Sequence, residues 1–137
     1  MKQLLLICAV VALVGCHAGN KKNASKAKAI AEWKVIQAAI RKAAKKPTGE
    51  LTKADLEKVT RLELRGNQLT DVKHLEKITK LEWLDLNHNQ LTSLKGLEKL
   101  TQLKELYLSD SPDLTKAQID ELQKGLPKCD IFSNPTK

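Results

Sequence analysis

Hydrophobic residues return along this chain at a fixed interval of 22 positions. At that spacing three successive segments place the same residue types in the same columns: Val59, Leu81 and Leu103; Leu62, Leu84 and Leu106; Leu64, Leu86 and Leu108. The L-x-L pair puts two leucines on one face of a strand, because strand side chains alternate with a period of two. A partial fourth segment follows at a spacing of 23, with Leu126, Cys129, Ile131 and Asn134 in the corresponding columns.

The stretch from Leu81 to Leu100, LEWLDLNHNQLTSLKGLEKL, resembles the turn of a leucine-rich repeat, L-x-x-L-x-L-x-x-N-x-L. One such unit cannot bury its leucines alone. We therefore expect a short right-handed α/β solenoid in which about four parallel strands lie side by side. The column of Asn67, Asn89 and Ser111 is expected to bond the backbone where it leaves each strand, with Ser111 the weak member.

Helical caps are predicted at both ends of the repeats, which we place at residues 59–113. The N-terminal cap, residues 26–58, begins with a helix from Ser25 to Lys46 that carries four large hydrophobic residues on one broad face: Ile30, Trp33, Ile36 and Ile40. Pro47 and Gly49 stop this helix. We expect Trp33 to seal the open end of the solenoid.

Two short patterns predict helix starts within the caps. Thr52 with Asp55, and Thr115 with Gln118, have the spacing of a capping box. The C-terminal cap, residues 114–137, is expected to hold a helix to about Lys124, ended by Gly125, and a last strand within 126–132. Cys129 occupies a leucine column, so we interpret it as a buried thiol.

The N-terminus carries an apolar run of eleven residues from Leu4 to Val14. It is too short for a membrane span, which needs about 20 residues, but suits the core of a signal peptide. Leu13-Val14-Gly15-Cys16 resembles the lipobox of bacterial lipoproteins. That resemblance implies a signal peptide at 1–15, acylation of Cys16 and a lipidated basic tether at 16–25. The alternatives are an uncleaved anchor or an ordinary secretory signal.

The same resemblance implies a location. The chain is expected to be lipid-anchored in the cell envelope, facing the periplasm or the surface. His17 follows the cysteine where aspartate would retain a lipoprotein at the inner membrane, so an outer membrane is favoured if the cell has two.

Most of the net charge of +8 belongs to one segment. Residues 21–46 hold nine lysines and arginines against the single acid Glu32, whereas the chain from Pro47 onward is nearly neutral. Lysines close to a bilayer attract anionic headgroups, although a solvated helix face explains the same composition. With no basic stripe on the repeats, we expect no nucleic-acid partner.

The segment from Ala39 to Leu64, AIRKAAKKPTGELTKADLEKVTRLEL, resembles the helical cap and first strand of internalin-type bacterial leucine-rich-repeat proteins. With the turns that follow, the resemblance covers about residues 33–134. Internalins that engage host receptors have many more turns and usually an immunoglobulin-like domain. Because this chain has neither, the resemblance does not imply a role in host invasion.

The outward positions of the predicted strands form the candidate binding face, on the concave side of the sheet. In register at 22 and then 23 residues they give three columns: Arg61, Trp83, Glu105 and Lys128; Glu63, Asp85, Tyr107 and Asp130; Arg65, Asn87, Ser109 and Phe132. His88 lies at the edge. Exposed Trp83 and Tyr107 among charges of both signs are typical of a binding hot spot. A solvent-exposed sheet that binds no partner would show the same pattern.

No catalytic motif accompanies this face. The sequence lacks a phosphate-binding glycine loop, H-E-x-x-H and G-x-S-x-G, so we predict that it is not an enzyme and has no cofactor, metal or small-molecule substrate. The leading hypothesis is a lipid-anchored module that binds a protein or peptide on the concave face. A structural envelope lipoprotein without a specific partner and an inhibitor of a secreted enzyme are the alternatives.

Overall fold

A computed structural model describes residues 21–134 of the chain. The predicted signal peptide at 1–15, the lipidated Cys16 and the start of the tether lie outside the described residues. Within residues 21–134, no helix has the length and apolar character needed to cross a membrane.

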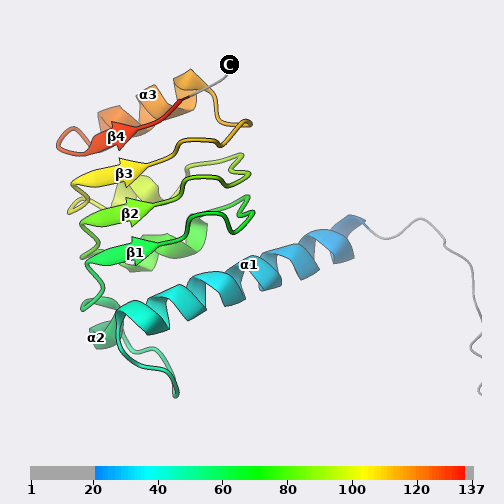
Figure 1. Ribbon diagram of the computed structural model, residues 1–137, viewed down its shortest axis with the longest axis vertical. Helices are drawn as coiled ribbons and strands as arrows, with labels where there is room; N and C mark the ends of the chain where they lie inside the picture. Colours follow the sequence, from blue (N-terminus) through cyan, green and yellow to red (C-terminus); the bar gives the residue numbers. More distant parts are fainter. Residues whose placement is uncertain (1–20, 135–137) are drawn as a thin grey trace, which may run out of the picture.

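Four parallel strands stack side by side in chain order, as the 22-residue period predicts (Figure 1). They are β1 (Arg61–Glu63), β2 (Trp83–Asp85), β3 (Glu105–Tyr107) and β4 (Asp130–Phe132). Each strand returns to the next through a helical segment behind the sheet: η1 (Lys73–Lys77), η2 (Leu97–Lys99) and the longer α3 (Lys116–Gly125). The N-terminal side holds α1 (Lys21–Ala43) and α2 (Lys53–Leu56). This arrangement confirms the predicted fold class.

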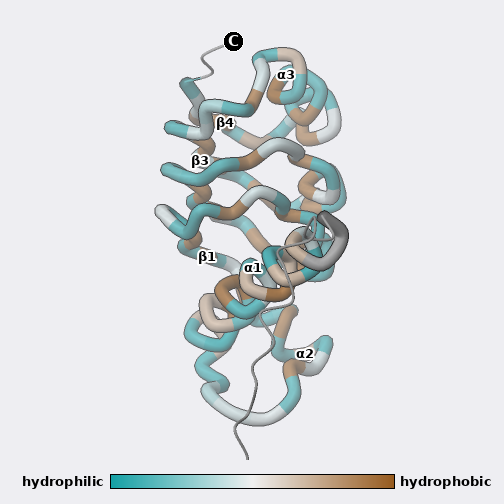
Figure 2. Tube along the Cα trace, turned by 90° about the vertical axis from the view of Figure 1, so that its right-hand side faces the viewer, coloured by the Kyte–Doolittle hydropathy of each residue, from teal (hydrophilic) through white to brown (hydrophobic). Residues whose placement is uncertain are grey.

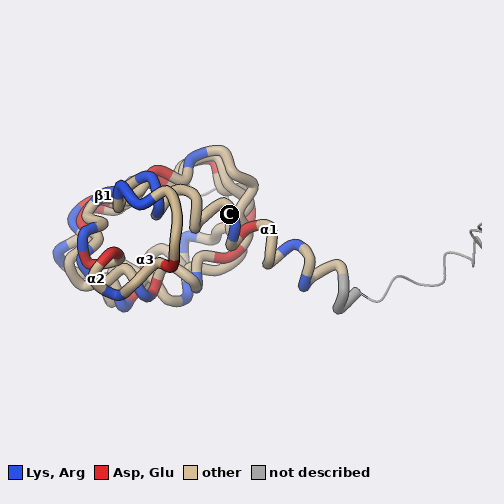
Figure 3. Tube along the Cα trace, turned by 90° about the horizontal axis from the view of Figure 1, so that it is seen from below, with Lys and Arg blue, Asp and Glu red and all other residues tan. Residues whose placement is uncertain are grey.

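The leucine columns face a common interior. Leu62, Leu84 and Leu106 are almost completely buried, and so are the leucines two positions further on. Brown hydrophobic positions recur on every coil in Figure 2, alternating with hydrophilic ones along the strands. Seen end on, the coils overlie one another and α1 projects to one side (Figure 3). The core is therefore one continuous stack, to which every coil adds a similar layer.

Asn89 is the member of the asparagine column that binds the backbone on both sides. Its side-chain oxygen accepts from the backbone N–H groups of Asn67 and Leu69, and its side-chain amide donates to the carbonyls of Leu64 and Leu86 at 2.9 and 2.8 Å. Ser111, next in the column, is buried, and its hydroxyl makes no hydrogen bond within the described part of the chain. The series of hydrogen bonds from this column to the backbone is therefore interrupted at Ser111, whose side chain is shorter than that of asparagine.

The predicted register of the last strand was wrong. Leu106 pairs with Ile131, Glu105 with Asp130 and Tyr107 with Phe132, so the final spacing is 25 residues rather than 23. The cause is α3, a ten-residue α-helix in place of the short 3₁₀ turns η1 and η2. An α-helix advances about 1.5 Å per residue against about 2.0 Å for a 3₁₀-helix, so it takes up more chain over the same distance.

The long helix α1 covers the β1 end of the core with its C-terminal half. Ile36 and Ile40 are buried, and half-buried Trp33 packs on the core and lies 4.7 Å from the His74 ring. Glu32 accepts hydrogen bonds from the backbone N–H and hydroxyl of Thr70 at 3.1 and 2.6 Å. These contacts join the helix to the first coil.

Two details of α1 differ from expectation. The helix begins before Ser25, at Lys21, and ends before Lys46, at Ala43, so part of the predicted tether is helical. Ile30 is 53% exposed, because the N-terminal half of α1 projects beyond the solenoid in Figure 1 and meets no coil there. An apolar residue at helical spacing is buried only where a partner surface exists.

Both predicted capping boxes are present. The Thr52 hydroxyl accepts from the Asp55 backbone N–H, while the Asp55 carboxylate accepts in return from the Thr52 backbone N–H. Thr115 and Gln118 exchange the same pair of bonds at the start of α3. Lys46 also donates to Asp55 at 2.6 Å. This bond and those from Thr52 hold the pKa of the Asp55 carboxyl well below its ordinary value.

Candidate functional site

The outward side chains of the four strands form the surface that we call the concave face. Their register defines two rows: Arg61, Trp83, Glu105 and Asp130; Glu63, Asp85, Tyr107 and Phe132. All eight are exposed or half-buried, whereas the leucine between each pair is buried in β1, β2 and β3. The two predicted columns that fall within the strands are therefore correct over the first three strands. On the fourth, Asp130 and Phe132 replace Lys128 and Asp130.

Three aromatic rings meet across this face. The ring centroids of Trp83 and Tyr107 are 5.6 Å apart, and those of Tyr107 and Phe132 are 4.8 Å apart with only 16° between their planes. Trp83 and Tyr107 stand in different rows and meet as diagonal neighbours, which large rings can reach. The sequence predicted the first pair but placed Phe132 in the column of Arg65 instead of beside Tyr107, because the register of β4 depends on α3.

A cation already lies against one end of the aromatic row. The Arg61 guanidinium carbon is 3.7 Å from the centroid of the Trp83 ring, within the range of a cation–π interaction. Arg61 also lies 3.7 Å from Glu63, so it offsets part of the repulsion between Glu63 and its row neighbour Asp85. At the β1 end of the concave face, Arg61 and Glu63 thus partly neutralise each other.

Tyr107 is fixed by its neighbour on the same strand. Its hydroxyl donates to the Glu105 carboxylate at 2.8 Å. This bond, with partial burial and the charge of Glu105, raises the pKa of the Tyr107 hydroxyl above its ordinary value. The hydroxyl is a protonated donor at neutral pH, and its bond to Glu105 fixes the orientation of the ring.

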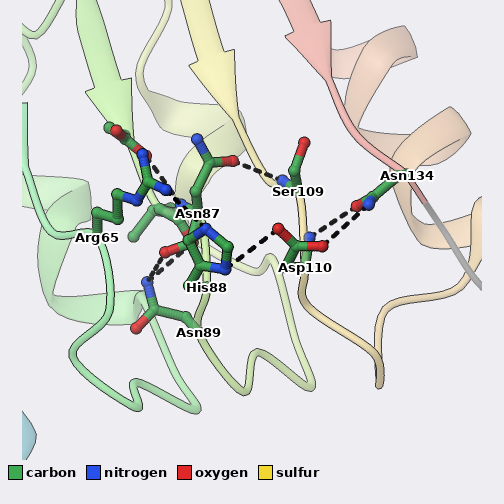
Figure 4. A network of polar contacts seen from close by, with 9 residues as sticks. Arg65, Asn87, His88, Asn89, Ser109, Asp110 and Asn134 are labelled. Carbon is green, nitrogen blue, oxygen red and sulfur yellow. Dashed lines mark hydrogen bonds and ion pairs between the residues drawn. The ribbon is translucent and has the colours of Figure 1, made fainter.

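A polar chain runs along the edge of the sheet where the strands end (Figure 4). Arg65 lies 2.8 Å from His88 Nε2, His88 Nδ1 lies 3.1 Å from the Asp110 carboxylate, and Asp110 exchanges two hydrogen bonds with Asn134. The sequence predicted His88 at the edge of the face and Arg65 in its third column, whereas Asp110 and Asn134 were not among the predicted site residues.

The backbone explains why these side chains line up. Gly66, His88 and Asp110, each 22 residues apart, all have positive φ, at 70°, 55° and 58°. Histidine and aspartate are among the few residue types that adopt this conformation readily. The period-22 column of such residues was the signal that could have found Asp110. Alongside it, the Asn87 side-chain oxygen accepts from the Ser109 backbone N–H at 2.7 Å.

The described residues present aromatic and charged side chains on the outward side of the sheet. Within residues 21–134, no three His, Cys, Asp or Glu side chains are grouped to hold a metal ion. Burial, together with the charges of Asp130 and Glu105, raises the pKa of the Cys129 thiol to about 11. At neutral pH that thiol is protonated and unreactive. What the sheet presents instead is a row of partly exposed rings bordered by carboxylates.

A family model for leucine-rich repeats, in two copies, matches residues 79–124, the region from just before β2 to the end of α3. The chain folds as a short leucine-rich-repeat solenoid. Among solved structures the solenoid is similar to an internalin (inlF) from Listeria monocytogenes, at 25% sequence identity and a TM-score of 0.63. That similarity covers 75% of this chain and 31% of the internalin chain.

Two further structures share the fold. Internalin C2 (inlC2) from Listeria monocytogenes has 20% identity and a TM-score of 0.50, covering 75% of this chain and 56% of its own. A chain of the Chaetomium Mex67:Mtr2 subunits has 21% identity and a TM-score of 0.51, covering 76% and 70%. No curated protein sequence matches the solenoid. This chain spans less than two thirds of the length of either internalin. The predicted resemblance to internalins is confirmed for the repeat fold.

Proposed function

We propose that this chain is a lipid-anchored, extracytoplasmic leucine-rich-repeat module that binds a protein or peptide on its concave face. Leucine-rich-repeat solenoids are typically protein-binding modules, because stacked coils give an extended surface for a partner. The aromatic row is the observation that carries the proposal. Aromatic and arginine side chains dominate binding energy at protein interfaces, and Arg61, Trp83, Tyr107 and Phe132 lie in contact across four strands.

The surrounding residues suit the same role. Arg65, Asn87 and His88 border the row at one edge, and the carboxylates of Glu63, Asp85 and Glu105 lie among the rings. A centre of aromatic rings with a polar rim is the usual anatomy of an interface. These residues are held in place by neighbouring strands, so little side-chain freedom is lost when a partner binds.

Capture of a partner tests the binding proposal. The full-length chain is immobilised and compared with a variant carrying Trp83→Ala, Asp85→Asn and Tyr107→Ala. We expect the partner to be retained by the wild type and lost from the variant. A variant with Asp120→Asn and Glu121→Gln on α3, away from the sheet, is expected to retain it. A partner that binds all three equally would contradict the concave face, and the absence of any captured partner would favour the structural lipoprotein.

The anchor is a separate part of the proposal. It is supported by the apolar run and by Leu13-Val14-Gly15-Cys16, all of which lie outside the described residues. Metabolic labelling with a radioactive fatty acid tests it. We expect label on the wild-type chain and none on Cys16→Ala, whereas label that persists in Cys16→Ala would remove the lipidation site and the location inferred from it.

A further inference from the structure

The two ends of the concave face differ in charge. Both arginines of the face stand at the β1 end, where Arg61 lies against Trp83 and Glu63, and Arg65 against His88. Strands β3 and β4 carry no lysine or arginine of their own, and their outward residues are Glu105, Tyr107, Asp130 and Phe132. Lys104, just before β3, is paired with Glu82 at 2.8 Å, and exposed Lys128 lies two positions before β4. Among the outward strand positions themselves, negative charge gathers at the β4 end of the aromatic row.

Two of these carboxylates oppose each other without a cation between them. Glu105 and Asp130 are register partners on neighbouring parallel strands, whose backbones lie about 4.8 Å apart. Glu105 accepts only the Tyr107 hydroxyl, and the Asp130 carboxylate has no ion pair or hydrogen bond among residues 21–134. Like charges opposite each other on a sheet repel, and a bound cation would reduce that repulsion.

Rings lie beside the same carboxylates. Tyr107 and Phe132 are stacked at 4.8 Å, and Phe132 remains 45% exposed at the end of the row. The first ring of the row already holds a guanidinium on its face, that of Arg61 on Trp83. A ring face beside paired carboxylates is a site for an alkylammonium or guanidinium group, through cation–π and charge-assisted hydrogen bonds together.

We propose that the β3–β4 half of the concave face binds a lysine- or arginine-bearing extended segment of a protein partner. One basic side chain lies against the exposed ring of Phe132 and ends between Glu105 and Asp130. This inference rests on the proposed function, for which it supplies the chemical class of partner. The positive charge of the chain lies mainly in residues 21–46 and the solenoid is nearly neutral, so the overall charge does not attract basic peptides, and a preference for them would come from the local acidic pair.

Peptide binding tests the inference directly. The probes are three fluorescein-labelled decapeptides of alternating Arg-Ser, Gln-Ser and Glu-Ser, titrated with the full-length chain in a non-ionic detergent and followed by fluorescence anisotropy. We expect the Arg-Ser peptide to bind most tightly and its affinity to fall with added salt. Equal or tighter binding of the Gln-Ser or Glu-Ser peptide, or no binding of the Arg-Ser peptide, would overturn the inference.

Variants locate the binding site. Glu105→Gln with Asp130→Asn should weaken Arg-Ser binding about tenfold, since charged hydrogen bonds are lost. Phe132→Ala should weaken it about threefold. The control, Asp120→Asn with Glu121→Gln, removes the same two charges from α3 and should leave binding unchanged. Equal weakening in the control would overturn the inference.

The unfolding temperature distinguishes a variant that has lost the binding site from one that has lost the fold. Removing two opposed carboxylates relieves repulsion, so the Glu105→Gln, Asp130→Asn variant should unfold at the same temperature as the wild type or a higher one. Weaker binding by a chain that is at least as stable supports the site, and weaker binding explained by unfolding overturns it. If partner capture still depends on Trp83, Asp85 and Tyr107 while basic peptides fail to bind, this inference fails and the proposed function stands.

Discussion

Leu86 shows how much stability one inward position contributes. It is completely buried in the middle coil, with leucines from the coils on either side of it in the same column. We expect Leu86→Ala to lower the free energy of unfolding by about 2 to 5 kcal/mol, out of roughly 5 to 15 for a domain of this kind. Leu86→Asp should abolish cooperative unfolding altogether. Thermal melts followed by circular dichroism measure both, and a cooperative melt of Leu86→Asp near the wild-type temperature would refute the register.

Substitution of Asn89 is a second test, and Asn67, in the same column, is its control. Asn89→Ala leaves buried backbone groups of two coils without partners, which should cost about 3 kcal/mol or more. Asn67 is exposed, and its side-chain amide makes one bond, to the Arg65 carbonyl. Asn67→Ala should therefore change the unfolding free energy by no more than about 0.5 kcal/mol. Urea denaturation compares the two, and similar losses would show that the series of hydrogen bonds from this column does not depend on Asn89.

The sequence could predict which residues face inward but not how equivalent members of a column differ. Asn67, Asn89 and Asn134 look alike in the repeat. Only Asn89 has its side chain enclosed between coils and is buried, while Asn134 ends in a bond to exposed Asp110. Ile30 fits the helical pattern as well as Ile36 does, yet it meets no coil. Position within the stack, which periodicity does not encode, decides these cases.

Among the elements, the short helix α2 depends on an ionised Asp55. Because hydrogen bonds from Lys46 and Thr52 hold the pKa of Asp55 well below its ordinary value of about 3.9, the folded chain binds fewer protons than the unfolded chain in acid. The stabilisation is complete above that ordinary value and is lost as the pH falls below it. We expect the urea midpoint to drop steadily below about pH 4.

Asp55→Asn separates this contribution from other acid effects. The variant should be less stable than the wild type at neutral pH, and its urea midpoint should fall less steeply in acid, because one stabilising carboxylate is no longer titrated. An acid slope identical to that of the wild type would show that Asp55 does not contribute to the pH dependence.

The capping boxes at Thr52 and Thr115 were predictable because local chemistry determines them. The register of β4 was not, because it depends on whether the preceding return segment is a 3₁₀ turn or an α-helix. The predicted spacing of 23 followed the columns of Leu126 and Cys129, both of which are buried as expected. Burial alone did not reveal that α3 shifts the strand that follows by two further residues.

Across the whole molecule, the solenoid covers one end of its core with α1 and leaves the outward side of its sheet free. Trp83, Tyr107 and the charged residues on β1 and β2 were predictable as site residues, since strand alternation places them outward. Asp130 and Phe132 were predicted on the same face but in the wrong columns, because their register follows from α3. Asp110 and Asn134 were missed, because their positions follow from the left-handed residues at the sheet edge. These four residues extend the candidate face to its acidic end.

Site-specific photo-crosslinking tests the central claim most directly. A photoreactive residue is placed at Asn87, on the concave face, and in a second chain at Glu121, on α3, and both chains are irradiated in the native envelope. We predict one discrete crosslinked protein from position 87 that is missing from position 121 and disappears when Trp83 and Tyr107 are both replaced by alanine. The same crosslinked species from both positions, or from position 87 with the rings removed, would contradict a partner bound on the concave face.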